Sequence, residues 1–281
     1  MCDELTAADN ANMMTRRGFG TATAALGVAA MLPSSADAAE VRGRDVTITT
    51  SDGTCDAYFV APITGKHPAV LVWPDIFGLR PAFRQMADRL AAAGYAVLTV
   101  NQFYRSTKSP FAKTGQGFDD AFRAKVDPWR AVLTHEATTR DAKAFIAFLD
   151  AQPQVDKKRG IGSTGYCMGG PMVMLTAAAS PARVRAGGTF HGGGLATDPM
   201  LALVPSMKAN WLIAIAENDD ARAPADKDKL RAAFAAGKQP AEIEVYKGTM
   251  HGWCPPDSPV YNQPQAEHAW TRLQALLGKA L

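Results

Sequence analysis

Short apolar runs and segments with helical periodicity alternate along most of the chain. The apolar runs, each typical of a strand buried on both faces, cover residues 67–73, 96–100, 160–166, 185–190, 211–216 and 241–246. Between the first two runs, Phe83, Met86, Ala87 and Leu90 follow the spacing i, i+3, i+4, i+7 of one helix face. The same kind of spacing recurs in residues 142–149 and 266–277. This alternation predicts a single α/β domain with a mostly parallel, doubly wound sheet and helices on both faces.

Two segments depart from this alternation. Residues 46–50 and 56–60 flank the turn sequence Ser51-Asp52-Gly53, which predicts an antiparallel hairpin at one edge of the sheet. Residues 102–129 are rich in Phe, Gly and Lys and have no clear period. Loops of this length are usually functional or disordered, so we expect this segment to form a wall or a lid of the binding pocket.

A cysteine stands between two glycines directly after the run 160–166. Residues 165–170 have the sequence Gly-Tyr-Cys-Met-Gly-Gly, and a largely apolar, helix-forming stretch follows. This pattern is typical of a nucleophile elbow, in which a sharp strand-to-helix turn holds the nucleophile in a strained conformation and needs small neighbours. The alternative is a buried structural cysteine in a glycine-rich turn. The elbow interpretation makes Cys167 the candidate nucleophile.

The residues that follow favour the elbow interpretation. A nucleophile of this kind is followed along the chain by an acid and then by a histidine base. The acidic residues of 217–220 come directly after the run 211–216, and His251 comes shortly after the run 241–246. Parallel sheets place their active sites at the carboxyl ends of their strands, so these groups should meet Cys167 there. We predict that His251 is the base.

His191 also ends an apolar run, in the sequence Phe-His-Gly-Gly-Gly of residues 190–194. It precedes the acidic residues, so the chain order disfavours it as the base. We expect His191 to contact substrate or to have a structural role.

At this point the chain resembles the dienelactone hydrolase family, a cysteine-nucleophile branch of the α/β-hydrolases. Beyond the elbow, the resemblance rests on the loop Pro-Asp-Ile-Phe-Gly of residues 74–78, on Gly-Tyr-Ala-Val of 94–97, on 100–105 and on His-Gly-Trp of 251–253. These motifs occur in the family's order, and the resemblance spans roughly residues 46–277. The resemblance implies an α/β-hydrolase fold and hydrolysis of a small ester or lactone through an acyl-cysteine intermediate.

The resemblance also assigns further residues to the site. The backbone N–H groups of Met168 and Ile76 would hold the oxyanion. Asp75 would hydrogen-bond the cysteine at rest, or would merely cap its own loop. The positions that would contact substrate are Tyr104, Arg105 and Trp253.

Three departures from the family pattern bear on the substrate and on the acid. Asp75 stands where the family often has Glu, and residues 254–257 lack the second arginine of relatives that bind a dienelactone carboxylate. Arg105 therefore remains as a carboxylate clamp or as a solvated loop charge. The acid position is ambiguous, because a small residue three positions before it indicates Asp219 whereas a proline four positions after it indicates Asp220. We prefer Asp219, with Asp220 as the alternative.

The first 38 residues have the pattern of a twin-arginine signal peptide. Arg16 and Arg17 precede an Ala-rich, weakly apolar stretch, and Ala36-Asp37-Ala38 forms a small-x-small cleavage site. The apolar stretch is shorter than the roughly 20 residues that span a bilayer. We therefore expect the twin-arginine machinery and signal peptidase as partners, with residues 39–281 as an exported periplasmic or secreted hydrolase domain.

Charge and cysteine content exclude several other classes. Residues 39–281 carry 28 basic and 23 acidic side chains without a Lys/Arg block, so we expect no nucleic-acid partner. No C-x-x-C or His/Cys cluster occurs, so we expect neither a metal nor another cofactor, and a thiol redox protein is disfavoured. We expect a monomer. A Cys55–Cys254 disulfide in an oxidising compartment stays open, as does the alternative function of a binding protein that has lost catalysis.

Overall fold

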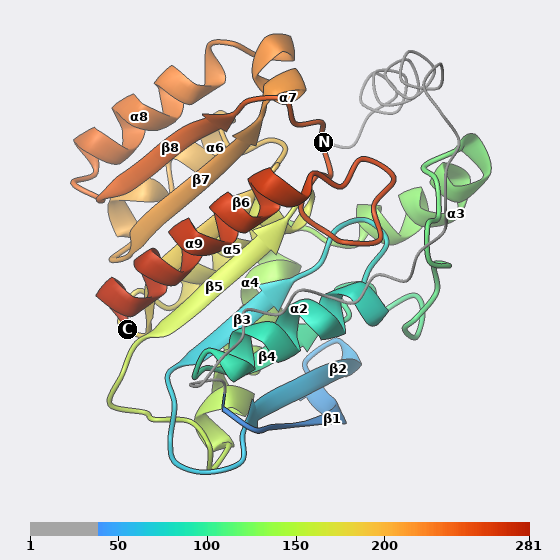
Figure 1. The fold of residues 1–281 in the computed structure, drawn as a ribbon, viewed down its shortest axis with the longest axis vertical. Coiled ribbons are helices and arrows are strands. Elements are labelled where there is room, and N and C mark those ends of the chain that lie inside the picture. The colour runs from blue at the N-terminus through green and yellow to red at the C-terminus, as the bar shows by residue number, and fades with distance from the viewer. Residues whose placement is uncertain (1–38) are drawn as a thin grey trace.

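The computed structural model describes residues 39–281, which form one eight-stranded sheet with helices on both faces (Figure 1). The strands lie in the order β1-β2-β4-β3-β5-β6-β7-β8, and the pairs from β4 to β8 are parallel. They are β1 (Val41–Thr50), β2 (Gly53–Pro62), β3 (Ala69–Trp73), β4 (Ala96–Val100), β5 (Ile161–Tyr166), β6 (Val184–Phe190), β7 (Asn210–Ala216) and β8 (Ala241–Tyr246). The predicted α/β fold is confirmed. The predicted signal peptide, residues 1–38, lies outside the described residues.

The predicted edge hairpin is also confirmed. Strands β1 and β2 pair antiparallel through a tight turn, with Thr50 opposite Gly53. Gly53 has φ +138°, a conformation that L side chains rarely adopt, so glycine suits the turn. Strand β2 then joins the sheet antiparallel to β4, which brings the hairpin beside the strand that carries residues 101–105 at its carboxyl end.

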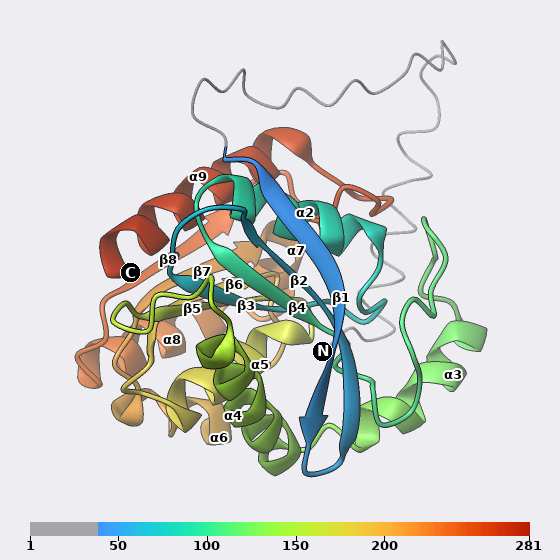
Figure 2. The same cartoon turned by 90° about the horizontal axis from the view of Figure 1, so that it is seen from below.

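Helices cover the two faces of the sheet unequally. In Figure 2, α2 (Pro81–Ala92) and α9 (Gln263–Ala280) lie on one face, and α4 (His135–Ala151), α5 (Gly169–Ala179) and α8 (Asp226–Ala236) lie on the other. The shorter helical elements are α3 (Asp120–Ala131), α6 (Asp198–Leu201), a 3₁₀ helix (Val204–Ser206) and α7 (Glu217–Arg222). The sheet thus separates two hydrophobic cores.

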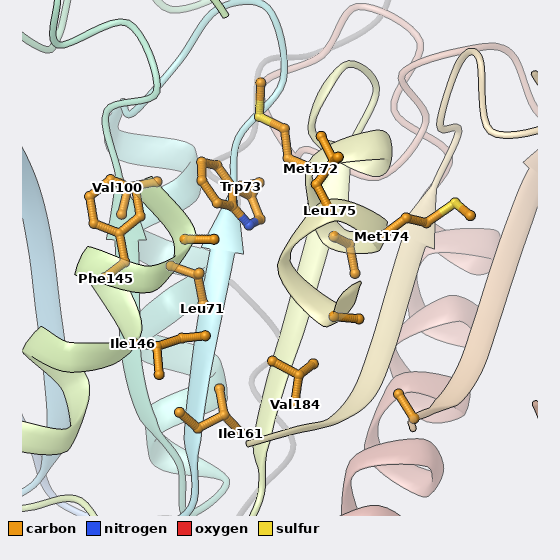
Figure 3. Packing of buried hydrophobic residues seen from close by; sticks show 14 of the residues in the cluster. Leu71, Trp73, Val100, Phe145, Ile146, Ile161, Met172, Met174, Leu175 and Val184 are labelled. Atoms are coloured by element: carbon orange, nitrogen blue, oxygen red, sulfur yellow. The ribbon is translucent and has the colours of Figure 1, made fainter. Parts of the chain in front are cut away.

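Strand β3 shows how a continuous apolar run serves both cores. All five of its residues are buried. Leu71 and Trp73 belong to the core on the α4–α5 face, whereas Val70 and Val72 belong to the core on the α2–α9 face. Successive side chains of a strand point to opposite faces, so a central strand needs apolar residues at every position. Figure 3 shows Leu71 and Trp73 packed beside side chains of α4 and α5.

The expected long loop at residues 102–129 is in part a helix. Helix α3 begins at Asp120, and the Asp119 side chain caps it by accepting a hydrogen bond from the Phe122 N–H at 2.8 Å. Its buried residues are Phe122 and Val126, and Pro128 lies inside the helix. Such a short apolar face, interrupted by proline, gives little periodic signal, which is why the sequence did not predict this helix.

Candidate active site

Cys167 lies at the sharp turn between β5 and α5. Its φ is +54°, a left-handed conformation that is strained for a residue other than glycine. A Cβ atom at Gly165 would lie 2.1 Å from the carbonyl oxygen of Gly169, and one at Gly169 would lie 2.4 Å from that of Trp73. Both glycines are therefore required by close backbone contacts, as the elbow interpretation predicts.

His251 and Asp219 are directly hydrogen-bonded. The Nδ1 atom of His251 lies 2.7 Å from Oδ2 of Asp219, and the imidazole is buried with 6% exposure. Asp220, the alternative acid, instead accepts hydrogen bonds from the Lys227 ammonium at 2.7 and 2.9 Å. When the Asp219 carboxylate accepts the Nδ1 proton, the basic lone pair of the ring lies on Nε2. Of the two candidate acids, the geometry supports Asp219.

Three consecutive residues of α7 hold the loop that carries His251. Glu217 accepts a hydrogen bond from the Gly248 N–H at 3.0 Å and donates its own N–H to the Thr249 hydroxyl at 3.2 Å. The next residue, Asn218, accepts the His251 N–H at 2.8 Å through its side-chain oxygen. These bonds, together with Asp219, fix both the backbone and the ring of His251. Glu217 and Asn218 lie beside the acid in the sequence, but no sequence pattern predicts this positioning role.

His191 lies behind His251 and is buried. Its ring centroid is 5.0 Å from that of His251 and 5.1 Å from that of Trp253, and both contacts are edge-on. Burial and then the nearby His251 lower the pKa of His191 well below its usual value, so this imidazole is neutral. His191 is 1% exposed and Trp253 is fully buried. Of the two roles considered for His191, the geometry supports the structural one, and Trp253 is buried against His191.

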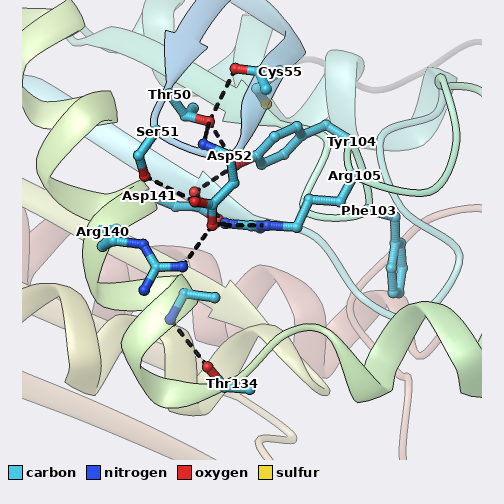
Figure 4. A network of polar contacts seen from close by, with 12 residues as sticks. Thr50, Ser51, Asp52, Cys55, Phe103, Tyr104, Arg105, Thr134, Arg140 and Asp141 are labelled. Carbon is cyan, nitrogen blue, oxygen red and sulfur yellow. Dashed lines mark hydrogen bonds and ion pairs between the residues drawn. The ribbon is translucent and has the colours of Figure 1, made fainter.

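Tyr104 and Arg105 belong to a polar network at the tip of the edge hairpin (Figure 4). The Arg105 guanidinium donates to both oxygens of Asp141 at 2.7 and 2.9 Å and to Asp52 at 2.6 and 3.1 Å. The Tyr104 hydroxyl donates to Asp141 at 2.7 Å, and Arg140 also donates to Asp52. Hydrogen bonds from Arg140 and then Arg105 hold the pKa of Asp52 far below its usual value.

This network engages the Tyr104 hydroxyl and the Arg105 guanidinium, the two groups that were expected to contact substrate. Two carboxylates already occupy the guanidinium fork that a substrate carboxylate would need. The carboxylates come from the hairpin turn and from α4, so Arg105 ties these two elements to the segment after β4. No local sequence pattern indicates this pairing, because Asp52 and Asp141 are 53 and 36 residues from Arg105.

Asp75 is held by a buried arginine that the sequence analysis missed. Arg80 donates to both Asp75 oxygens at 2.7 and 3.0 Å and, on its other edge, to both oxygens of Asp257 at 2.7 and 3.0 Å. Asp75 also accepts the Phe77 N–H at 2.9 Å. Asp75 therefore caps its own loop, as the alternative interpretation held. Arg80 joins this loop to the loop after His251, which carries Asp257.

The backbone around Ile76 is oriented by Gln102. The buried amide of Gln102 donates to the carbonyl oxygens of Asp75 at 2.7 Å and Pro74 at 3.2 Å. In a trans peptide the carbonyl and the following N–H point in opposite directions, so this contact also sets the direction of the Ile76 N–H. Among the described residues, neither the Ile76 N–H nor the Met168 N–H has an acceptor. Both are therefore available to an oxyanion.

Cys55 and Cys254 are both buried free thiols. They belong to the hydrophobic cores on opposite faces of the sheet, which excludes the Cys55–Cys254 disulfide that the sequence left open. Burial raises the pKa of each thiol, so both remain protonated at neutral pH.

Within residues 39–281 no group of three or more His, Cys, Asp or Glu residues could hold a metal ion, and no helix is long and apolar enough to cross a membrane.

A parallel sheet with a strained cysteine elbow after β5, a carboxylate after β7 and its histidine after β8 defines an α/β-hydrolase. A sequence profile of the dienelactone hydrolase family matches residues 55–281. The chain belongs to the dienelactone hydrolase family and is a hydrolase.

Three relatives illustrate this relationship. A Methylorubrum extorquens protein provisionally named a carboxymethylenebutenolidase is 28% identical over 267 residues, which cover 92% of this chain and 89% of the relative. The carboxymethylenebutenolidase of Rhodococcus opacus is 27% identical over 74% of this chain and 80% of its own. The crystal structure of a provisionally named dienelactone hydrolase from Klebsiella pneumoniae has a TM-score of 0.74 at 21% identity and covers 85% of this chain and 99% of its own. The last likeness concerns the fold alone.

Proposed function

We propose that the protein hydrolyses small esters or lactones, as a carboxymethylenebutenolidase does, through Cys167, His251 and Asp219. The observation that carries the proposal is the 2.7 Å hydrogen bond between His251 and Asp219 on the strand ends beside the Cys167 elbow. The order of these residues along the chain and the family membership support the same assignment.

In the first step His251 takes the proton of the Cys167 thiol, and the thiolate attacks the carbonyl carbon of the substrate. The N-terminus of α5 begins two residues after Cys167, and a helix N-terminus and an imidazole both favour a thiolate. As the tetrahedral intermediate collapses, the C–O bond to the alcohol breaks and His251 returns the proton to the leaving oxygen. A thioester of Cys167 remains; an open-chain ester releases its alcohol, whereas a lactone keeps the freed hydroxyl on the acyl group that is bound to Cys167.

In the second step water replaces the alcohol. His251 takes a proton from a water molecule, whose oxygen attacks the thioester, and the C–S bond breaks to release the carboxylic acid and the thiol. Asp219 fixes the tautomer of His251 and stabilises its charged form in both steps. The N–H groups of Met168 and Ile76 stabilise the oxyanion. Removing one such donor typically raises the barrier by about 3–4 kcal/mol.

The chemistry of a thiolate favours activated oxygen esters over amides. The thiolate leaves a tetrahedral intermediate more easily than an amine does, so the intermediate from an amide tends to revert. We therefore expect turnover of lactones, enol esters and aryl esters and none of peptides.

The first test compares two cysteine variants on p-nitrophenyl acetate. Cys167→Ala should abolish turnover and retain the fold, because the elbow depends on the close contacts of Gly165 and Gly169 and not on the sulfur. Cys254→Ala is the matched control and should keep most activity, because this thiol is buried and protonated. Iodoacetamide should inactivate the reduced wild-type protein with label on Cys167. Full turnover by Cys167→Ala would refute the nucleophile assignment.

We also propose that the protein is exported in the folded state and cleaved after Ala38. The support is the arginine pair of residues 16 and 17, the apolar stretch and the cleavage sequence. Replacing both arginines with lysine should leave the precursor in the cytoplasm, as fractionation and immunoblotting would measure. Equal export of this variant would refute the route, and exported protein whose N-terminal sequence begins at Met1 would refute the cleavage.

A further inference from the structure

A cluster of aromatic side chains adjoins both proposed oxyanion donors. It comprises Phe77, Phe103, Phe111, Phe118, Phe122 and Trp129, and we call it the aromatic cluster. Ile76 lies within the same hydrophobic group, and Met168 packs against it. Except for Phe77, its rings come from the segment between β4 and α4. In Figure 4 the Phe103 side chain points away from the polar network in which its neighbours Tyr104 and Arg105 take part.

The rings of the cluster form a connected set of contacts. The Phe111 centroid lies 5.2 Å from Trp129 and 5.4 Å from Phe103, and Phe77 lies 5.1 Å from Phe122. Phe103 and Phe122 are buried, whereas Phe77, Phe111 and Trp129 are half-buried. The cluster therefore has an inner layer that supports it and an outer layer with accessible ring surface. Aromatic side chains of this kind favour contact with flat apolar groups.

Arg80 and Arg105, the two arginines of the loops after β3 and β4, are both already paired with carboxylates and do not offer a guanidinium to an anionic substrate. Arg80 is held between Asp75 and Asp257, so this group has an excess of one negative charge, whereas Arg105 and Arg140 together balance Asp52 and Asp141. Two cations of α3 lie over ring faces of the cluster, Arg123 at 5.2 Å from Phe118 and Lys125 at 5.5 Å from Trp129. An uncharged substrate needs no guanidinium partner, and it avoids repulsion from Asp75 and Asp257.

We propose that the aromatic cluster is the subsite for the aryl group of an uncharged aromatic ester. This inference rests on the proposed function and specifies its substrate class. The scissile carbonyl lies between the N–H groups of Met168 and Ile76, and the aryl group packs on the half-buried rings of Phe77, Phe111 and Trp129. The protein then differs from relatives that bind an anionic dienelactone.

A matched pair of substrates tests the charge preference. 4-Carbamoylphenyl acetate and 4-carboxyphenyl acetate have nearly the same size and shape, but the second is an anion at neutral pH. We expect kcat/KM of the wild-type protein to be at least tenfold higher for the carbamoyl ester. Equal values or a preference for the carboxylate would overturn the inference and leave the proposed function intact. Failure to hydrolyse any ester, with Cys167 unreactive, would instead refute the proposed function.

Variants of the outer layer test the aromatic contact. Trp129→Ala and Phe111→Leu should each lower kcat/KM for phenyl acetate about tenfold, mainly through KM, and should leave vinyl acetate nearly unchanged. Phe148→Ala is the control, because Phe148 packs on Phe59 at the core on the α4–α5 face of the sheet and is not part of the aromatic cluster. Phe111→Leu retains apolar volume, and circular dichroism would verify that each variant folds. Equal losses on both esters would show that the cluster is only structural and would overturn the inference.

Discussion

The loops after β7 and β8 differ in kind from the segment after β4. After β7, Glu217, Asn218 and Asp219 each form a hydrogen bond with residues 248–251, so a set of hydrogen bonds holds His251 in place. After β4, residues 102–131 contribute rings that contact one another, and the polar contacts of Arg105 are directed toward the edge hairpin. The first region fixes the acid–base pair, and the second shapes the surroundings of the scissile bond. Reaction and selectivity are therefore separable by mutation.

The largest expected effect lies in the first region. Asp219→Asn should lower kcat/KM by roughly a thousandfold or more, because the amide does not hold His251 in the required tautomer. Asp220→Asn is the matched control and should retain most activity, because Asp220 pairs with Lys227. Steady-state kinetics on p-nitrophenyl acetate would measure both. A greater loss in Asp220→Asn would transfer the acid role to that residue.

In the second region, Arg105→Ala should affect stability more than selectivity. It leaves the buried carboxylate of Asp141 without its ion pair, so the free energy of unfolding should fall by about 3 kcal/mol. Arg140→Ala, which also removes a partner of Asp52 but is half exposed, should lower it much less. Urea unfolding would measure both values. If Arg105→Ala instead raises KM selectively for an anionic ester, Arg105 binds the substrate carboxylate, as the clamp hypothesis holds.

In the same region, Gln102→Leu should show whether Gln102 orients the Ile76 N–H or contributes to substrate binding. Loss of the amide frees the carbonyl oxygens of Pro74 and Asp75 and misaligns the Ile76 N–H, so kcat should fall roughly tenfold to a hundredfold with little change in KM. Gln116→Leu, at a half-buried position of the same segment where the amide donates only to the neighbouring Gly117 carbonyl, should behave as wild type. If KM rises while kcat is unchanged, Gln102 acts on substrate binding and not on the oxyanion.

The smallest effect concerns the pH dependence of stability that results from the burial of His191 beside His251. His191 is neutral in the folded protein, since its pKa lies well below 6.5, whereas the unfolded chain takes up a proton below about pH 6.5. Stability from this group is therefore present above that pH and is lost as the pH falls, by up to about 1.4 kcal/mol per pH unit. His191→Phe should remove this contribution, and His135→Phe, at an exposed position, should not. Identical pH slopes in the wild type and His191→Phe would contradict the neutral assignment.

The sequence was informative where local sterics or strand ends determine the structure. Gly165 and Gly169 could be predicted because the elbow needs them locally, and His251 could be predicted because it follows a strand end. The pairing of Arg80 with Asp257 joins residues 177 positions apart and has no local pattern. The intramolecular contacts of Tyr104, Arg105 and Trp253 could not be predicted for a related reason. Their side chains contact residues that are distant in the sequence, such as Asp141 and His191, so these partners become known only from the folded structure.

The segment 102–129 illustrates the same limit in the aromatic cluster. Its phenylalanines were visible in the sequence, but they have no helical or strand period, and their contacts depend on Phe77 and Met168 from other loops. Composition indicated a pocket wall, whereas the ring contacts depend on tertiary packing.

The central claim is that Cys167 becomes acylated during turnover. The most direct measurement is rapid acid quench of reduced protein during hydrolysis of p-nitrophenyl acetate, followed by mass spectrometry of the peptides. The account predicts an acetyl group on the peptide that contains Cys167, formed within one turnover and removed when substrate is exhausted, with none on Cys55 or Cys254. Sustained turnover while Cys167 stays unmodified, or acetylation that outlasts many turnovers, would contradict the account.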